Sequence, residues 1–395
     1  MSTVGDTIRA RGHGRIRTLV IGAGVAGLTL AALLRQRGEQ PHIVERAGSL
    51  DEAGYNVALY PIGSRVLHGL GLFDRLLATS RPARYYELGN GKGEVLHRFD
   101  FDAVLAQYGP LVGLKRAELL AVLRSALGDL PIHVGTTVTA LQPEQDEVRV
   151  TFNDGSQASF DLVVGADGMH SATRSMLLGP EEFAYWDTGW GCWVTWADEA
   201  IVPPETMAEF WGAGFLVGIY PVKGAQGVVI AGPTKALKKD GRTAFAEHVR
   251  HHLRDFGGPV PAVLDALEKD PRPFFWDLHD CRCRRWTAGR VVLLGDAAAG
   301  FLPTAGVGAS MAMMSAAALA DELSRADAAH VEYALRLFVS RARPKVEAAQ
   351  DNSRHLSKLM MIDSLPLAWG REQLLRFYTL DQALRDIMRV MEGTI

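Results

Sequence analysis

Three stretches that combine glycine with an acidic residue follow apolar, strand-like segments, and these residue types suit a phosphate-containing ligand. The first, "GAGVAG", carries Gly22, Gly24 and Gly27 after "RTLVI", and Glu45 ends the next apolar segment 18 residues after Gly27. The glycines permit a tight turn, a close approach of the backbone to a pyrophosphate and close packing of the following helix. The acid can accept hydrogen bonds from ribose hydroxyls. This spacing predicts a dinucleotide-binding βαβ unit, with a glycine-rich turn that binds no ligand as the alternative.

The other two glycine and acid stretches extend this prediction along the chain. "GADG" at 165–168 and Gly295-Asp296 each follow an apolar segment. Because the carboxyl ends of parallel strands meet at one edge of a sheet, we expect one long ligand to lie across that edge. The fingerprint alone does not separate NAD from FAD, since both contain adenosine diphosphate. Asp296 also has a structural alternative, as the cap of a following helix.

Strands and helices must position these residues, and the hydrophobic pattern predicts where they lie. Strands are expected at 17–22 and 41–46, helices at 25–37 and 118–127, and two strands around a turn at Asp154-Gly155. From about 183 to 276 the segments become aromatic-rich and are broken by glycine and proline, which indicates a separate antiparallel sheet inserted into the nucleotide domain. Residues 331–395 read as amphipathic helix with breaks near Pro344 and Pro366.

Composition limits the class of protein. The chain has 395 residues, 48% hydrophobic and 22% charged, with a formal net charge of −3, which is ordinary for a soluble globular protein and does not indicate nucleic-acid binding. Its three cysteines are too few for a disulfide framework and favour a cytoplasmic location. "RARGHGRIR" before the first apolar run imitates an export signal, but that run contains the glycine motif and is too short to span a membrane.

The order and spacing of these motifs resemble a known family. "GAGVAG" with Glu45, "GADGMHSATR", "GDAAAGFLPTAGVGASMAM", "NVALYPIGSRVLHGLGLFDRL" and "GLKRAELLAVLRSAL" are similar to the group A flavoprotein aromatic hydroxylases, the family resembling para-hydroxybenzoate hydroxylase. The resemblance covers nearly the whole chain. It implies an α/β fold: a doubly wound, Rossmann-like FAD-binding domain, an inserted and mainly antiparallel substrate domain, and C-terminal helices.

The resemblance also implies domain boundaries. The FAD-binding domain is expected in three parts, the substrate domain in two, and a helical segment at the end. The ranges are 1–80, 111–182 and 277–345 for FAD binding, 81–110 and 183–276 for the substrate domain, and 346–395 for the C-terminal segment.

Individual FAD contacts follow from the same resemblance. Arg116 is expected to hold the ribityl and phosphate part of the flavin, Asp296 to reach the ribityl chain, and Asp167 to serve both FAD and NAD(P)H. The full set expected to bind FAD is Gly22, Gly24, Ala26, Gly27, Glu45, Arg46, Arg116, Asp167, Gly295, Asp296, Pro303, Gly306, Val307, Gly308 and Ala309. The chain departs from the family pattern at Ala299, Ser310 and Met314, where many members have His, Asn and an acid.

The stretch after Asp296 has a physical explanation if a flavin binds there. Pro303 ends an extended segment, and a helix that begins near Gly306 would aim its free N–H groups at the pyrimidine end of the ring. Reduced flavin carries negative charge at that end, and a helix dipole stabilises such a charge by about 0.3–2 kcal/mol. Gly306 and Gly308 let the backbone approach the ring.

Aromatic residues are the candidates for the substrate site. Six of the eight tryptophans lie between Trp186 and Trp276. We expect them to contribute to an apolar cavity over the flavin, with Trp211, Tyr220 and Pro303 as wall residues. Ordinary sheet core is the alternative for each aromatic residue, because aromatic side chains are good strand formers.

Two further residue patterns resemble metal-binding or phosphate-binding sites but have simpler explanations. His248 and His252 are spaced like metal ligands, and "HDCRC" contains Cys281 and Cys283, but neither supplies a complete ligand set and no metal is expected. The neighbouring arginines could meet the phosphate of a nicotinamide cofactor, although a solvated charge run explains them as well. They are Arg282, Arg284 and Arg285.

The resemblance therefore predicts a monooxygenase with non-covalent FAD. NADPH or NADH would supply a hydride and O2 would react, so that a flavin C4a-hydroperoxide transfers hydroxyl to an aromatic or polyketide-like molecule. Since the cofactor does this chemistry, no catalytic base is assigned. The alternatives are a flavin halogenase, a flavin dehydrogenase, a flavin-binding protein without turnover and a flavin-free NAD dehydrogenase. "WVTWAD" does not match the halogenase signature. The identity of the substrate and the oligomeric state stay open.

Overall fold

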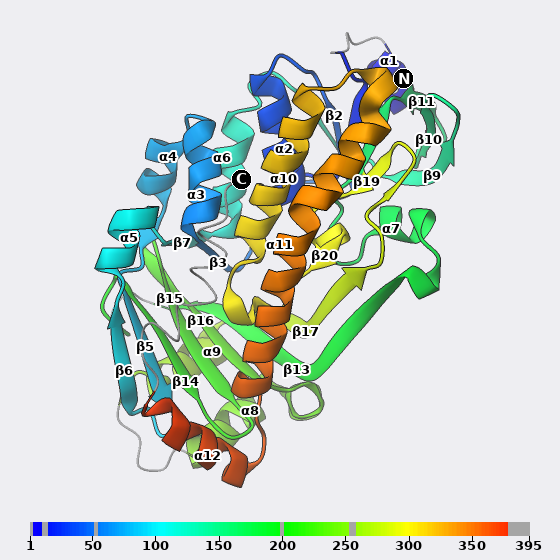
Figure 1. Ribbon diagram of the computed structural model, residues 1–395. Helices are drawn as coiled ribbons and strands as arrows, with labels where there is room; N and C mark the ends of the chain where they lie inside the picture. The colour runs from blue at the N-terminus through cyan, green and yellow to red at the C-terminus, as the bar shows by residue number, and fades with distance from the viewer. Residues whose placement is uncertain (1–2, 10–14, 51–53, 198–200, 253–257, 378–395) are drawn as a thin grey trace.

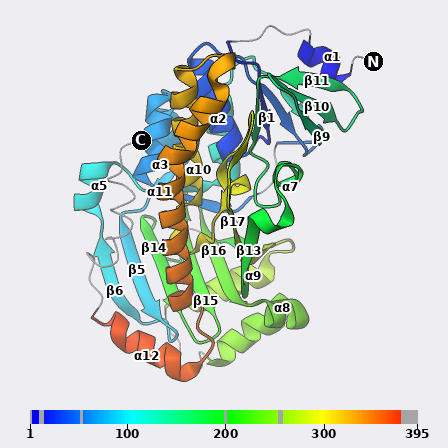
Figure 2. The same cartoon turned by 45° about the vertical axis from the view of Figure 1, so that its right-hand side comes forward.

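Two large sheets lie at opposite ends of the molecule, and a long helix, α11 (Val331–Met360), extends alongside both (Figures 1 and 2). The structure is a computed structural model of the 395-residue chain. The residues that it describes are 3–9, 15–50, 54–197, 201–252 and 258–377.

The first sheet is the predicted nucleotide-binding sheet. Its six strands lie in the order β18 (Thr287–Ala288), β19 (Val291–Leu293), β12 (Leu162–Gly165), β1 (Thr18–Ile21), β2 (His42–Glu45) and β8 (Ile132–Val134). Every neighbouring pair is parallel except β18 and β19. The central strands are short runs of Val, Ile and Leu because both faces of the sheet are covered.

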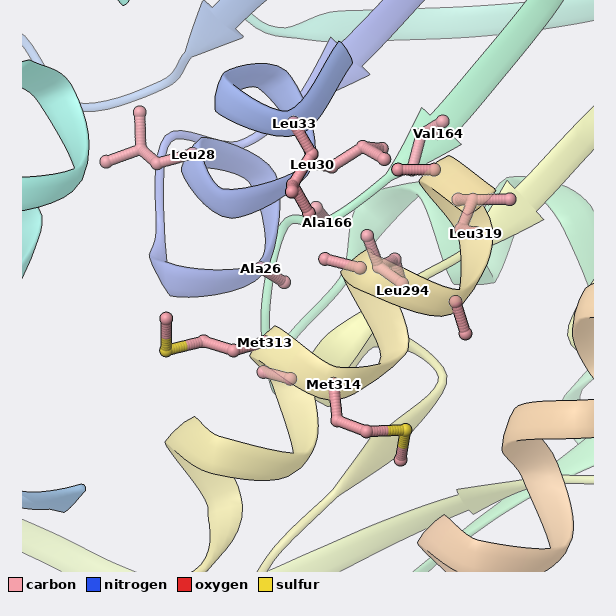
Figure 3. Packing of buried hydrophobic residues seen from close by; sticks show 14 of the residues in the cluster. Ala26, Leu28, Leu30, Leu33, Val164, Ala166, Leu294, Met313, Met314 and Leu319 are labelled. Atoms are coloured by element: carbon pink, nitrogen blue, oxygen red, sulfur yellow. The ribbon is translucent and has the colours of Figure 1, made fainter. Parts of the chain in front are cut away.

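Helices cover one face of this sheet and a small sheet covers the other. Val20, Ile43 and Val164 pack in one core cluster with the helices α2 (Val25–Gln36), α6 (Arg116–Ser125) and α10 (Gly308–Ser324). Figure 3 shows part of this cluster, with Leu30 of α2 and Leu319 of α10 among the labelled residues. The alternate strand residues pack against a three-stranded sheet. That sheet consists of β11 (Gln157–Phe160), β10 (Val148–Phe152) and β9 (Val138–Pro143).

The second large sheet has eight strands. Their order is β20 (Ala299–Gly300), β17 (Phe274–Cys283), β13 (Phe183–Ala197), β16 (Ala225–Pro233), β15 (Leu216–Val222), β14 (Thr206–Trp211), β5 (Tyr85–Asn90) and β6 (Val95–Asp100). Only the pair β14 and β5 is parallel. One face packs on α8 (Thr234–His252) and α9 (Val260–Lys269) through a separate apolar cluster.

Smaller elements join the two sheets. A three-stranded sheet of β3 (Asn56–Leu59), β7 (Val112–Lys115) and β4 (Arg81–Pro82) lies between them. A Cβ atom on Gly113 of β7 would stand 1.8 Å from the carbonyl oxygen of Pro221 on β15, so this glycine permits close contact between the two parts. The helices near this junction are α3 (Pro61–Gly69), α4 (Phe73–Thr79) and α5 (Asp102–Tyr108).

The remaining helices lie at the chain ends and in connections. They are α1 (Val4–Arg9), α7 (Ala172–Leu177) and α12 (Leu365–Leu375), with 3-10 turns η1 (Pro180–Glu182), η2 (Gly295–Ala297), η3 (Pro303–Ala305) and η4 (Ala328–His330). No helix in the described ranges is long and apolar enough to cross a membrane.

Two local expectations were wrong. Pro344 does not break the C-terminal helix, because α11 continues through it; buried Phe338, Ala342 and Val346 on both sides keep the helix packed despite the lost hydrogen bond. The stretch after the Asp154-Gly155 turn is two strands rather than one, since the chain crosses from β11 to β12 at Asp161. Pro366 does lie in the first turn of α12. The part of the predicted C-terminal segment at 378–395 falls outside the described residues.

Candidate active site

One cavity of about 420 Å³ extends from the ends of the parallel strands to the free face of the eight-stranded sheet. We call the end nearest the parallel sheet the cradle. Its lining residues include Gly24, Val25, Ala26, Arg116, Asp296, Pro303, Gly306, Gly308 and Ala309. We call the end on the eight-stranded sheet the chamber. Its polar and aromatic lining residues include Tyr86, Trp190, Glu209, Trp211, Tyr220 and Trp276.

The three glycines of the first motif have three different environments. Gly22 has φ +106°, and a Cβ there would stand 2.4 Å from the carbonyl oxygen of Ala166. A Cβ on Gly27 would stand 2.0 Å from the carbonyl oxygen of Gly22, so close packing of helix on strand requires glycine. A Cβ on Gly24 would meet nothing within 4 Å, and Gly24 lines the cavity. The turn, the packing contact and the open approach to a ligand therefore belong to different glycines, as the motif predicts.

Glu45 holds the first loop in place. Its two carboxylate oxygens accept hydrogen bonds from the backbone N–H groups of Ala23 and Ala47, each at 2.8 Å. Each oxygen keeps a second acceptor site, which suits the predicted contact with ribose hydroxyls. The Arg46 side chain is exposed at the end of β2. Neither residue lines the cavity itself.

Asp167 organises the second loop. Its carboxylate accepts hydrogen bonds from the Ser171 hydroxyl at 2.5 Å and from the backbone N–H of Thr173 at 2.9 Å, which fixes the start of α7. The neighbouring Ala166 and Gly168 line the cavity, while Asp167 does not. The structure therefore gives Asp167 a positioning role. Its predicted contacts with FAD and NAD(P)H remain a prediction.

A buried arginine connects the loop at 165–168 with the loop at 295–297. Arg174 is 1% exposed. Its guanidinium donates to the carbonyl oxygens of Ala297 at 3.0 Å and Met169 at 2.6 Å, and to the hydroxyl of Tyr185. Since a guanidinium presents donors in a fixed plane, this contact sets the distance between the loops at 165–168 and 295–297.

Asp296 has the properties of a ligand-binding carboxylate. It lines the cavity, and no donor in the described part of the chain reaches its side chain. Separation from bulk water raises the pKa of Asp296 to about 6, and the positive charges of Arg116 and Arg174 oppose this rise. The helix-cap alternative does not describe its position. A ribityl hydroxyl would supply the missing donor, which fits the cofactor that the motifs predict.

The helix start predicted near Gly306 lies at Gly308. A 3-10 turn at Pro303–Ala305 leads to Gly306 with φ +64°, and α10 then begins without a side-chain cap. Gly306, Gly308 and Ala309 line the cavity, whereas the side chain of Val307 is buried in the core. The uncapped first turn leaves backbone N–H groups beside the cavity, which suits the predicted contact with an anionic flavin ring.

The three departures from the family pattern are accommodated by packing. Ser310 Oγ accepts a hydrogen bond from the backbone N–H of Tyr60 at 3.0 Å. Ala299 and Met314 are both 2% exposed and belong to the main core cluster. Neither position leaves a polar group unpaired, so these changes do not disturb the cradle.

The chamber brings the predicted residues Trp211 and Tyr220 together through a residue that the prediction missed. Glu209 accepts hydrogen bonds from both of them and from Tyr86. A single acid within the apolar strand "TMAEFW" was the signal for Glu209. Of the six clustered tryptophans, Trp190, Trp211 and Trp276 line the cavity. Trp193 instead packs on Phe275, with ring centroids 4.7 Å apart.

The arginines and cysteines that the sequence suggested as possible phosphate or metal ligands have other structural roles. Arg282 pairs with Asp351 at 2.6 Å and Arg285 with Glu182 at 2.5 Å, which supports the charge-run explanation. The three cysteines are free and buried. No group of His, Cys, Asp and Glu side chains in the described ranges could hold a metal ion.

Comparisons with known proteins agree with this geometry. The family model described as FAD binding domain matches residues 15–353. The chain is 34% identical over 370 residues to 3-amino-4-hydroxybenzoate 2-monooxygenase of Streptomyces cremeus, covering 91% of this chain and 92% of the relative. It is 29% identical over 310 residues to the FAD-dependent urate hydroxylase of Klebsiella pneumoniae, covering 77% and 80%.

A solved structure has the same fold. Klebsiella pneumoniae HpxO complexed with FAD and uric acid superposes with a TM-score of 0.87 at 26% identity, covering 96% of this chain and 97% of that one. The cradle described above therefore corresponds to a fold that is known to carry FAD. The chain belongs to the FAD-binding-domain family of flavin-dependent monooxygenases, the group A aromatic hydroxylases.

Proposed function

We propose that the protein hydroxylates a small, electron-rich aromatic molecule in the chamber, using FAD, O2 and either NADH or NADPH. The observation that carries this proposal is the continuity of the cavity. One space joins glycine-rich backbone and Asp296 at one end to tryptophan and tyrosine side chains at the other. A cofactor in the cradle and an aromatic molecule in the chamber would therefore be neighbours without a barrier between them.

The names of similar proteins support an aromatic or heteroaromatic substrate. The relatives include enzymes named for 3-amino-4-hydroxybenzoate, urate and a quinolone. These compounds differ in size and charge, but each has a planar ring with oxygen or nitrogen substituents. Such rings fit between the indole and phenol side chains of the chamber.

The residues of the cradle would hold FAD. Gly24 and the start of α2 would receive the pyrophosphate, Glu45 the ribose, Asp296 and Arg116 the ribityl chain, and the first turn of α10 the pyrimidine end of the ring. When bound, FAD accepts a hydride and activates O2. The protein's own contribution is to fix the substrate beside the cradle and to exclude water with apolar walls, among them Leu302, Phe301 and Leu278.

Three buried free thiols suit a reducing compartment. We therefore infer a cytoplasmic location.

The test is spectroscopic. The purified protein is expected to carry flavin absorption bands or to acquire them with added FAD, and NADPH or NADH should bleach these bands in the absence of oxygen. With an aromatic substrate present, admission of air should restore the bands with uptake of one O2 per hydroxylated product. A protein that neither contains nor takes up FAD would contradict the proposal. Turnover without oxygen would indicate a dehydrogenase, and incorporation of chloride or bromide would indicate a halogenase.

A further inference from the structure

A buried carboxylate forms part of the chamber wall. Glu209 lies on β14, is 8% exposed and lines the cavity. Its Oε1 accepts a hydrogen bond from the Tyr220 hydroxyl at 2.7 Å, and its Oε2 accepts from the Tyr86 hydroxyl at 2.9 Å and from Trp211 Nε1 at 3.0 Å. β5 and β15 pair with β14 on its two sides, so three neighbouring strands converge on this one carboxylate.

This carboxylate has no cationic partner. No Lys, Arg or His in the described ranges forms an ion pair with Glu209. Arg371 lies over the Trp211 ring, 5.8 Å from its centroid, but its Nη atoms donate to backbone carbonyl oxygens, including those of Trp211 and Gly212. The only arginine among the cavity-lining residues of the described chain is Arg116, which belongs to the cradle beside Asp296. The chamber therefore contains an acid and no compensating positive charge.

The hydrogen bonds leave Glu209 with spare acceptor capacity. An ionised carboxylate offers about four acceptor sites, and the three protein donors occupy three of them. Trp211 Nε1 can only donate, so Oε2 must be an acceptor. The unused site belongs to Oε1, which has Tyr220 as its only protein partner among the described residues. Burial raises the pKa of Glu209, and the three donors oppose that rise.

Stability alone is a poor explanation for this arrangement. A buried carboxylate with no cation costs free energy that an apolar side chain would avoid. The strand residues on either side, Ala208 and Phe210, are fully buried apolar side chains in the opposite core. An acid kept at this point of an otherwise aromatic wall suits the recognition of a ligand better than it suits packing.

We propose that Glu209 selects the substrate by accepting a hydrogen bond from an N–H or O–H group of an aromatic amine or phenol, and by repelling aromatic carboxylates. This inference rests on the proposed function and names the substrate class of the same chamber. The ligand needs a donor at the end that meets Oε1 and no negative charge at either end, because the chamber wall of the described chain has no cation to pair with a carboxylate. A protonated amine satisfies both conditions, as does a neutral aminophenol.

The test compares the binding of three probes to the oxidised, FAD-loaded protein in the absence of NADH and NADPH. The probes are 3-aminophenol, 3-hydroxybenzoate and 1,3-dimethoxybenzene, and binding is measured by calorimetry and by the change in flavin absorbance. Wild-type protein is expected to bind 3-aminophenol at least about tenfold more tightly than either of the others. Absence of 3-aminophenol binding, or a preference for 3-hydroxybenzoate, would overturn the proposal.

Glu209→Gln is the decisive variant. The amide can keep an oxygen facing Trp211 and Tyr86 while its NH2 group replaces Oε1, so the acceptor becomes a donor without a negative charge. The preference for 3-aminophenol over 3-hydroxybenzoate should fall to within about threefold or reverse. An unchanged preference would contradict the assignment. Glu87→Gln is the matched control, because Glu87 lies on β5, pairs with Arg98 and does not line the cavity; it should keep the wild-type preference.

Tyr220→Phe keeps the proposal testable if Glu209→Gln fails to fold. This change removes one donor and leaves the charge of Glu209 in place, so discrimination against 3-hydroxybenzoate should persist. Loss of that discrimination would assign selection to the Tyr220 hydroxyl instead. All these measurements concern binding without turnover. Failure of the monooxygenase proposal would appear separately, as absent FAD or absent oxygen uptake.

Discussion

The two ends of the cavity are built from different parts of the polypeptide. In the cradle, backbone geometry defines the site: Gly24 leaves an open approach, Gly306 turns the chain, and α10 begins without a cap. In the chamber, side chains define it, with Glu209 gathering donors from three strands. The comparison explains how one fold can keep its cofactor while changing its substrate, since chamber side chains can be replaced without altering the cradle backbone.

The largest effect is expected from Gly27 and Gly24 of the first glycine motif, because one affects folding and the other affects cofactor binding. Gly27→Ala places a Cβ 2.0 Å from the Gly22 carbonyl oxygen and should lower the free energy of unfolding by about 3 kcal/mol. Gly24→Val should keep the free energy of unfolding of the FAD-free protein within about 1 kcal/mol of wild type, since Gly24 is the N-cap of α2, and should weaken FAD binding at least about tenfold. Urea unfolding and FAD titration measure the two quantities. Wild-type FAD affinity in Gly24→Val would show that Gly24 does not face the cofactor.

The second-largest effect is expected at Arg174, which connects the loops at 165–168 and 295–297. Arg174→Lys cannot reproduce the contacts with Met169, Ala297 and Tyr185, and we expect a loss of about 2 kcal/mol of stability together with weaker FAD binding. Arg285→Lys is the control, because its exposed pair with Glu182 should contribute less than about 1 kcal/mol. Equal losses in thermal unfolding for the two variants would refute the role given to Arg174.

Asp296 provides a pH-dependent test of the cradle. The pKa of Asp296 is about 6 in the folded FAD-free protein and has its ordinary value of 3.8 in the unfolded chain. Between these two values the folded protein binds more protons than the unfolded chain does. Stability should therefore fall as pH rises from about 4 to about 6. Asp296→Asn removes this loss, and the FAD-free variant should be more stable than wild type by about 1–2 kcal/mol at pH 8 while binding FAD more weakly.

The difference should shrink to about 0.5 kcal/mol near pH 4, because the Asp296 carboxyl of the folded protein is protonated there while that of the unfolded chain is about half ionised. Unfolding curves collected between pH 4 and pH 8 measure this difference. A constant difference across the range would exclude Asp296 as the titrating group.

The smallest effect is expected at a departure from the family pattern. Ser310→Ala leaves the backbone N–H of Tyr60 without its acceptor and should cost about 1 kcal/mol. Ser315→Ala on the same helix removes only a bond to the Met311 carbonyl oxygen and should cost less than about 0.5 kcal/mol. Unfolding measurements that reverse this order would contradict the view that Ser310 connects α10 to Tyr60 at the start of α3.

The contrast between a cradle defined by backbone and a chamber defined by side chains also explains which parts of the site could be predicted from the sequence. The βαβ unit and the three glycine and acid loops depend on residues close together in the chain, because a turn with positive φ at Gly22 and a close contact at Gly27 select glycine locally. The helix start near Gly306 was correct to two residues for the same reason.

The chamber could not be predicted in that way. Tyr86 and Glu209 are 123 residues apart in sequence, and the parallel pairing of β5 with β14 is what brings them together. Sheet register is set by tertiary packing, so Trp211 and Tyr220 could be proposed as aromatic wall residues but their shared partner could not be identified. Pro344 failed as a helix break for a related reason, because packing along α11 outweighs the local cost.

The most direct test of the account is the fate of molecular oxygen. FAD-loaded protein is supplied with NADPH or NADH, 3-aminophenol and ¹⁸O2 in unlabelled water, and the product is examined by mass spectrometry. The account predicts one ¹⁸O atom in a newly formed ring hydroxyl, with one NAD(P)H oxidised for each product. Oxidation of NAD(P)H that rises with 3-aminophenol but leaves no ¹⁸O in any organic product would contradict it.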